Sequence, residues 1–170
     1  RIFTYVSQKI RYMGVTPEDE APGYEPHDVS LTYQNKYGVC RDKAALLAVM
    51  LRMAGIEAYP VIIHAGERKD PEVPQLAFNH AIVAARSEAP DAAGAGKYIL
   101  MDPTNESSSR LLPEYLCEKS FIVATPDGEG LMESAALPAE ENMVSIKTES
   151  RVEGDWQLAD THIVFKGVND

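Results

Sequence analysis

Apolar residues recur every three to four positions in two stretches near the N-terminus, and this spacing is typical of one face of an α-helix. Residues 1–14 carry the first repeat, and Gly14 is the expected end of that helix. The stronger pattern runs from Arg41 to Met53, and Gly55 follows as a stop. A short helix is expected over residues 28–37. One side of the stronger helix carries Ala44, Leu47, Met50, Leu51 and Ala54.

After Gly55 the pattern changes to short runs of β-branched and apolar residues separated by Gly, Pro and Asp, which predict strands and turns. In the first of these strands, Pro60 indicates an edge position or a bulge. Helices followed by consecutive, hairpin-linked strands predict an α+β fold with an antiparallel sheet. The expected strands cover residues 56–65, 78–86, 97–104 and the beginning of 120–130.

Residues 133–142 (ESAALPAEEN) have the composition of a linker. We therefore expect a core domain over residues 1–137, and over 138–170 a linker and the start of a β-rich flanking region. The segment DTHIVFKG alternates apolar and polar residues and predicts strands that lack partners within this chain. Because the sequence begins at Arg1, we expect it to be part of a longer protein with further domains.

Charge and composition narrow the possible partners. Of the 170 residues, 45% are hydrophobic and 25% charged, and the net charge is −10. Nucleic-acid binding requires a basic surface, and anionic lipid attracts basic segments, so this acidic chain is predicted to bind neither. No apolar run is long enough to span a membrane. The scattered histidines and two cysteines lack metal-ligand spacing, so no metal or other cofactor is expected.

The position of Cys40 in the sequence indicates a reactive thiol. It lies where a loop becomes the strongest predicted helix, and the free N–H groups and dipole of a helix N-terminus stabilise a thiolate. The alternative is a small buried apolar residue. Cys117 lacks such a setting and is expected to be a buried or half-buried spacer.

His80 and Asp102 supply the groups that a thiol nucleophile needs. If the strands over 78–86 and 97–104 form a hairpin, position 80 lies roughly opposite position 102, and an Nδ1–H to carboxylate bond is expected. Such a bond orients the imidazole and stabilises its protonated form. The alternatives are a structural histidine and a turn-forming aspartate before Pro103.

These residues carry a family resemblance. The segments YGVCRDKAALLAVMLRMAGIEAYPV, NHAIV and LMDPT resemble the core of the transglutaminase-like superfamily. VSQKIRYMGV, GYEPHDVS and FNHAIVA resemble bacterial transglutaminase-like proteins described as cysteine proteases. The likeness covers about residues 1–130. It implies a papain-like core with the nucleophile-bearing helix packed on an antiparallel sheet, an exported, periplasmic location and flanking β-rich domains.

Carried over by position, the resemblance makes Cys40 the nucleophile, His80 the general base and acid, and Asp102 the residue that orients the imidazole. Arg41 stands where animal transglutaminases have Trp, so neither calcium activation nor glutamine–lysine cross-linking is inferred.

The backbone N–H of Cys40 is the expected first donor to an oxyanion, and Tyr12 or Gln34 is a candidate second donor. Asp42 is expected to support the first turn of the helix through the dipole or to brace a strand. His27 is expected in a loop, with lining of a cleft as the alternative.

The sequence thus predicts acyl transfer on a peptide or related amide through a thioester, most simply hydrolysis. The alternatives are transamidation to an amine, and a non-catalytic module of a larger envelope protein that binds peptide or glycopeptide.

Overall fold

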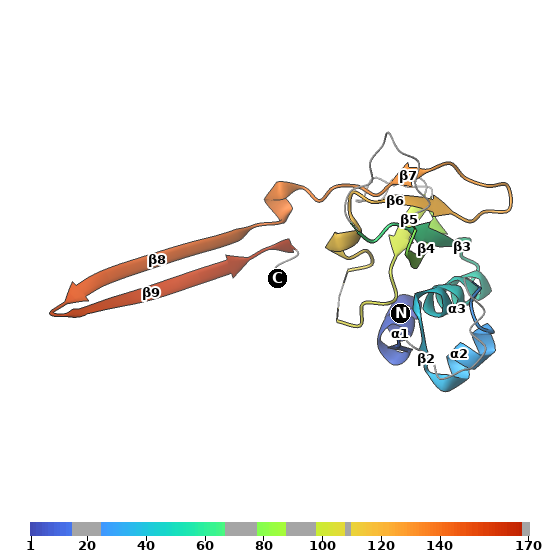
Figure 1. Cartoon of the computed structure of the whole chain (residues 1–170), viewed down its shortest axis with the longest axis horizontal. Coiled ribbons are helices and arrows are strands. Elements are labelled where there is room, and N and C mark those ends of the chain that lie inside the picture. The colour runs from blue at the N-terminus through green and yellow to red at the C-terminus, as the bar shows by residue number, and fades with distance from the viewer. Residues whose placement is uncertain (15–24, 67–77, 88–97, 108–109, 168–170) are drawn as a thin grey trace. The chain divides into compact units, whose positions relative to one another are not determined.

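The structure, a computed structural model, describes residues 1–14, 25–66, 78–87, 98–107 and 110–167. The chain divides into two compact units, residues 1–136 and 137–170 (Figure 1). In the first unit the elements are α1 (Ile2–Lys9), β1 (Arg11–Tyr12), α2 (Val29–Asn35), β2 (Tyr37–Gly38), α3 (Cys40–Met53), β3 (Ala58–Ile63), β4 (His80–Arg86), β5 (Tyr98–Met101), the 3₁₀ turn η1 (Glu114–Leu116), β6 (Ser120–Val123) and β7 (Met132–Glu133). The second unit contains the 3₁₀ turn η2 (Ala139–Glu141), β8 (Val144–Glu153) and β9 (Trp156–Phe165).

Helix α1 is shorter than the sequence predicts. It ends at Lys9, because Ile10 adopts an extended conformation, and the chain continues as the short strand β1 instead of reaching Gly14 as helix. The buried Nζ of Lys43 lies 3.1 Å from the Ser7 carbonyl oxygen and 2.5 Å from that of Ile10. A side chain from α3 therefore binds carbonyl groups that a longer helix would have bonded internally.

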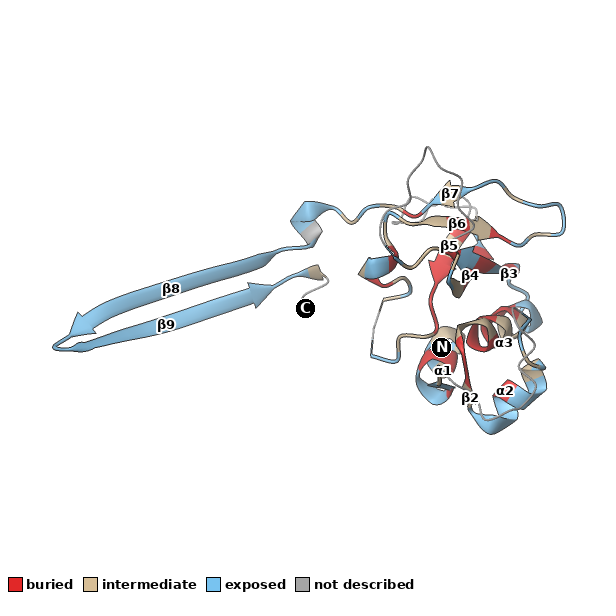
Figure 2. Cartoon of the chain, in the orientation of Figure 1, coloured by how far each residue is buried: buried red, intermediate tan, exposed pale blue. Residues whose placement is uncertain are grey.

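Helix α3 confirms the strongest prediction. It begins at Cys40, one residue before the expected start, and Gly55 follows its end with a φ of +80°. Most of the residues on its apolar side are buried, and Figure 2 shows the buried side of α3 in red. The helix N-terminus that carries Cys40 is thus fixed by a packed helix of 14 residues.

The five-stranded sheet has the order β5-β4-β3-β6-β7, and all its pairings are antiparallel. The prediction of an α+β fold is confirmed. Strand β3 lies inside the sheet, so the expectation that Pro60 marks an edge is wrong. The Pro60 carbonyl accepts from the Ala124 N–H, beyond the end of the β3–β6 ladder at Val61. In an antiparallel strand the N–H and C=O of one residue point to the same neighbouring strand, so the N–H that Pro60 lacks would also point toward β6, beyond the end of that ladder. Pro60 therefore interrupts neither the β3–β4 ladder nor the β3–β6 ladder.

The sheet separates two apolar clusters. On one face, residues of β3, β4 and β5 pack against α1 and α3, with Val6, Ile10 and Leu47 fully buried. On the other face, β3 to β6 pack with Leu116 of η1 and the buried ring of Tyr98. Apolar area buried on both faces is the main force that holds α3 to the sheet.

The register between β4 and β5 differs from the sequence expectation by two residues. Val83 lies opposite Met101, so continuing the ladder would place Ile82, not His80, opposite Asp102. A shift by two keeps every side chain on the same face of a sheet, whereas a shift by one would reverse it. His80 and Asp102 therefore remain on one face, as diagonal neighbours.

In the second unit, β8 and β9 form an antiparallel hairpin with Val144 opposite Phe165 and Glu153 opposite Trp156. The expectation that these strands lack partners is wrong, because they pair with each other, although no third strand joins them among the described residues. Both strands are exposed along their whole length (Figure 2).

The loops expected from the sequence over residues 15–30, 68–75 and 87–96 lie outside the described residues except for residues 25–30 and 87. In the part of the chain that the structure describes, no helix is both long and apolar enough to cross a membrane.

The buried amine of Lys43 makes a testable contribution to stability. Lys43→Ala is expected to lower the free energy of unfolding by about 2–4 kcal/mol, because it leaves a cavity and two unsatisfied carbonyl groups. Urea denaturation measures this, with Lys147→Ala on the exposed hairpin as the control, expected to change it by at most about 0.5 kcal/mol. Equal effects of the two substitutions would contradict the assigned role of Lys43.

Candidate active site

Cys40 is the first residue of α3 and is half-buried beside the start of β4. The His80 ring and the backbone N–H groups of Ala81 and Arg41 lie close enough to its side chain to act as hydrogen-bond donors to the sulfur. Burial raises the pKa of the Cys40 thiol, but these hydrogen bonds and the charge of His80 outweigh burial, so the pKa lies below its ordinary value. The sulfur is therefore in a setting that favours the thiolate.

His80 lies between Cys40 and Asp102. Its Nε2 is 3.0 Å from Asp102 Oδ2, which leaves Nδ1 for the sulfur; the expectation that Nδ1 bonds the carboxylate is wrong. Burial lowers the pKa of His80, yet the hydrogen bonds and negative charges of Asp102 and Cys40 raise it to about 9. Near pH 7 His80 is therefore protonated, and its positive charge favours ionisation of the Cys40 thiol.

The carboxylate of Asp102 is 0% exposed and has further donors that the sequence did not indicate as site residues. The Thr104 N–H and hydroxyl donate to Oδ1 over 2.9 and 2.6 Å, and the Tyr115 hydroxyl donates to Oδ2 over 2.7 Å. Burial raises the pKa of Asp102, but the bonds and charge of His80 and the Thr104 bonds lower it overall. The Asp-x-Thr spacing could have predicted the Thr104 contact, since Asp commonly bonds the backbone two residues ahead. No local pattern predicts Tyr115, which comes from η1.

Tyr12, one of the two candidate oxyanion donors, lies near this cluster. Its backbone N–H donates to Glu106 Oε1 over 2.6 Å, and β1 pairs in parallel with β2, which leads into α3. Burial and the negative charges of Cys40 and Asp102 raise the pKa of Tyr12. Its hydroxyl therefore stays protonated and able to donate at neutral pH.

Gln34, the other candidate, is exposed on α2. Within the described ranges no hydrogen bond connects it to Cys40, His80 or Asp102. The structure thus brings Tyr12 to the cluster and does not bring Gln34 there.

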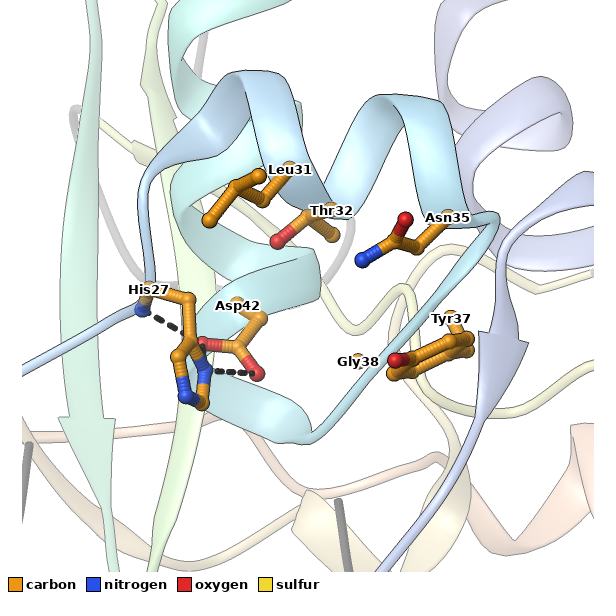
Figure 3. Close-up of a pocket in the computed structure, with 7 residues that line it drawn as sticks. All are labelled: His27, Leu31, Thr32, Asn35, Tyr37, Gly38 and Asp42. Atoms are coloured by element: carbon orange, nitrogen blue, oxygen red, sulfur yellow. Dashed lines mark hydrogen bonds and ion pairs between the residues drawn. The ribbon is translucent and has the colours of Figure 1, made fainter. Parts of the chain in front are cut away.

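Behind the first turn of α3 lies a second histidine–aspartate pair. The carboxylate of Asp42 accepts a hydrogen bond from the His27 backbone N–H at 2.9 Å. Both carboxylate oxygens also lie 3.2 Å from His27 Nδ1 (Figure 3). These two residues line a cavity of about 20 Å³ beneath α2, which is room for a single water molecule. His27 thus lies in the loop before α2, as expected, and its side chain contacts helix α3 through Asp42.

Other residues that could bind or react are less well placed. The Cys117 sulfur is half-buried, 4.0 Å from the Pro113 carbonyl oxygen, and burial raises its pKa. Among the described residues, no group of three or more His, Cys, Asp or Glu side chains is arranged to hold a metal ion.

Comparisons with known proteins bear on the family and the fold of this chain. The sequence profile of the transglutaminase-like superfamily matches residues 1–103, which contain Cys40, His80 and Asp102. No curated protein matches the chain in sequence. Among solved structures, the fold is similar to that of a protein described as "a putative protease from Parabacteroides distasonis". The TM-score is 0.54 and the identity 18%, over 90% of this chain and 30% of that one.

That likeness shows the fold, and this chain corresponds to less than a third of the length of the Parabacteroides protein. The profile match covers more than half of the 170 residues. Because the match spans α1 to β5, it includes α3, three of the five strands of the sheet, and Cys40, His80 and Asp102. The chain belongs to the transglutaminase-like superfamily.

Proposed function

We propose that this chain is a cysteine-dependent hydrolase of a peptide or related amide, with Cys40 as nucleophile, His80 as general acid and base, and Asp102 as the residue that orients His80. One observation carries the proposal: His80 lies between the Cys40 thiol, whose charge raises its pKa, and the buried Asp102 carboxylate, whose Oδ2 is 3.0 Å from Nε2. Nucleophile, base and orienting group in series are the arrangement that thiol-dependent acyl transfer requires.

The first step is acylation. The Cys40 thiolate attacks the amide carbonyl carbon and a carbon–sulfur bond forms. His80, protonated near pH 7, gives its proton to the leaving nitrogen as the carbon–nitrogen bond breaks. The products are a free amine and a thioester on Cys40.

The second step is deacylation. Neutral His80 takes a proton from water as the water oxygen attacks the thioester carbonyl. The carbon–sulfur bond breaks, the carboxylic acid product leaves, and the thiolate–imidazolium pair forms again. Asp102 stays ionised throughout, because its hydrogen bonds hold its pKa below the ordinary value.

Both steps develop negative charge on the carbonyl oxygen. We assign the donors for this oxygen to the backbone N–H of Cys40, at the N-terminus of α3, and to the hydroxyl of Tyr12. Tyr12 is preferred over Gln34 because it lies within electrostatic reach of Cys40 and Asp102.

The activated state of the thiol is directly testable with iodoacetamide. The rate of Cys40 alkylation is expected to rise at a lower pH than that of an ordinary thiol with a pKa of about 8.5. In His80→Ala, the contribution of His80 to lowering the Cys40 pKa is lost while burial remains, so the midpoint is expected to move to higher pH than in wild type. Mass spectrometry of the labelled peptide over pH 5–10 measures both.

Cys117→Ala is the control for this experiment. Because burial raises the Cys117 pKa, its removal is expected to leave the low-pH labelling unchanged. Equal pH profiles for wild type and His80→Ala would show that His80 does not activate the sulfur.

The reaction type is tested with a peptide library and a labelled primary amine. Wild type is expected to release free carboxyl termini, Cys40→Ala to be inactive, and Asp102→Asn to lose at least about 100-fold in kcat, since His80 loses its charged partner. Mass spectrometry distinguishes the outcomes. Amine incorporated into the peptides would instead identify a transamidase. Peptides bound by Cys40→Ala but never processed by wild type would indicate a binding module.

The hydroxyl of Tyr12 is tested with Tyr12→Phe. We expect a loss of about 10- to 100-fold in kcat for hydrolysis with little change in the iodoacetamide rate, because alkylation develops no oxyanion. Tyr33→Phe, on the exposed side of α2, is the matched control and is expected to behave as wild type. Unchanged kcat in Tyr12→Phe would exclude its hydroxyl as a donor.

A further inference from the structure

Asp42 is a carboxylate in the first turn of α3, two residues after the nucleophile, and it is 1% exposed. A buried carboxylate is costly unless donors satisfy it. Its Oδ2 accepts the backbone N–H of Val39 at 3.0 Å, and its Oδ1 accepts the backbone N–H of His27 at 2.9 Å. The ring Nδ1 of His27 lies 3.2 Å from both oxygens, so His27 contacts the Asp42 carboxylate through its ring as well as through its backbone N–H.

Both backbone polar groups of Val39, its N–H and its carbonyl oxygen, are consequently hydrogen-bonded. Asp42 binds its N–H, and its carbonyl oxygen accepts the Lys43 N–H at 3.0 Å as the first turn of α3 closes. The same planar peptide unit contains the Val39 carbonyl and the Cys40 N–H. Fixing Val39 therefore fixes the direction in which the Cys40 N–H points.

The backbone at Gly38, directly before Val39, passes close to the side chains of Asp42 and Thr32. A Cβ on Gly38 would lie 2.7 Å from Asp42 Cβ and 3.2 Å from Thr32 Cγ2, closer than side chains pack. Figure 3 shows Gly38 beside the Asp42 carboxylate, with His27 on the opposite side of Asp42. Glycine at this position lets the chain pass directly against Asp42.

His27 has no other polar role among the residues described. Its Nε2 is buried and has no hydrogen-bond partner there, so its hydrogen bonding is directed to Asp42. The cation closest to Asp42 in that part of the chain is Arg41, with Nε 4.0 Å from Oδ1, which is beyond hydrogen-bond distance. The Asp42 side chain is thus oriented by His27 and Val39.

We propose that His27 and Asp42 are positioning residues that hold the peptide unit between Val39 and Cys40 so that the Cys40 N–H points at the oxyanion. The inference rests on the proposed thiol chemistry and adds a group that the Cys40–His80–Asp102 cluster does not contain. It separates two roles: His80 sets the reactivity of the sulfur, and His27 sets the geometry of the oxyanion donor.

Two reagents that attack the same sulfur test this separation. With p-nitrophenyl acetate, the Cys40 thiolate attacks the ester carbonyl, a carbon–sulfur bond forms, and p-nitrophenolate leaves; the intermediate carries an oxyanion. With iodoacetamide, the thiolate displaces iodide and no oxyanion forms. The ratio of the two second-order rate constants in the whole chain, corrected with Cys40→Ala for Cys117, reports on the oxyanion donor.

In His27→Ala we expect this ratio to fall about tenfold, with the iodoacetamide rate within about twofold of wild type. His27→Asn, whose side-chain amide can replace the Nδ1 donor, is expected to restore the ratio to within about threefold. His162→Ala, on the exposed strand β9, is the matched control and is expected to leave the ratio unchanged. Thermal melts confirm that each variant is folded, and His27→Leu, of similar volume but without a donor, replaces His27→Ala if that variant does not fold.

An unchanged ratio in His27→Ala or His27→Leu would overturn the proposal. So would a fall of both rates together, because His27 would then act on the sulfur or on the fold as a whole. The measurement needs no natural substrate, so it remains decisive even if the chain hydrolyses no peptide, which is the result that would overturn the proposed function.

Discussion

The fully buried carboxylate of Asp102 is the group on which the geometry of the site depends. A carboxylate without water must be satisfied by donors, and here four hydrogen bonds do so: one from His80, one from Tyr115 and two from Thr104. Since Asp102 directly follows β5, these bonds also fix where that strand ends. The orientation of His80, and through it the state of the Cys40 sulfur, follows from this arrangement.

Helix α3 brings together the groups that act on the sulfur and the groups that hold the backbone. Cys40 faces β4, Asp42 binds the turn that precedes the helix, and the amine of Lys43 binds the end of α1. Each buried polar group is paired with a backbone group of a neighbouring segment. Consequently the segment after α1, which carries Tyr12, and the segment before α2, which carries His27, are both placed relative to one helix turn.

Desolvation and pairing act in opposite directions at every ionisable group of the cluster. Burial alone would neutralise Cys40, His80 and Asp102, whereas their mutual hydrogen bonds favour the charged forms and outweigh it. The balance holds only while the three remain in contact. This is why removal of His80 is expected to do more than remove a base: it leaves only the backbone N–H groups of Ala81 and Arg41 to oppose the effect of burial on Cys40.

The local sequence determined the helices and strands, because apolar periodicity and the stop at Gly55 depend on neighbouring residues. It also indicated thiol chemistry, because Cys40, His80 and Asp102 each lie at the end of a predicted element. The contact between His80 and Asp102 was predictable despite a register error of two, since an even shift preserves the face of the sheet. Tertiary structure alone decided that α1 ends at Lys9, that Tyr115 reaches Asp102 and that His27 holds Asp42. Each of these depends on a side chain from a distant segment satisfying a buried polar group, and no local pattern specifies such a partner.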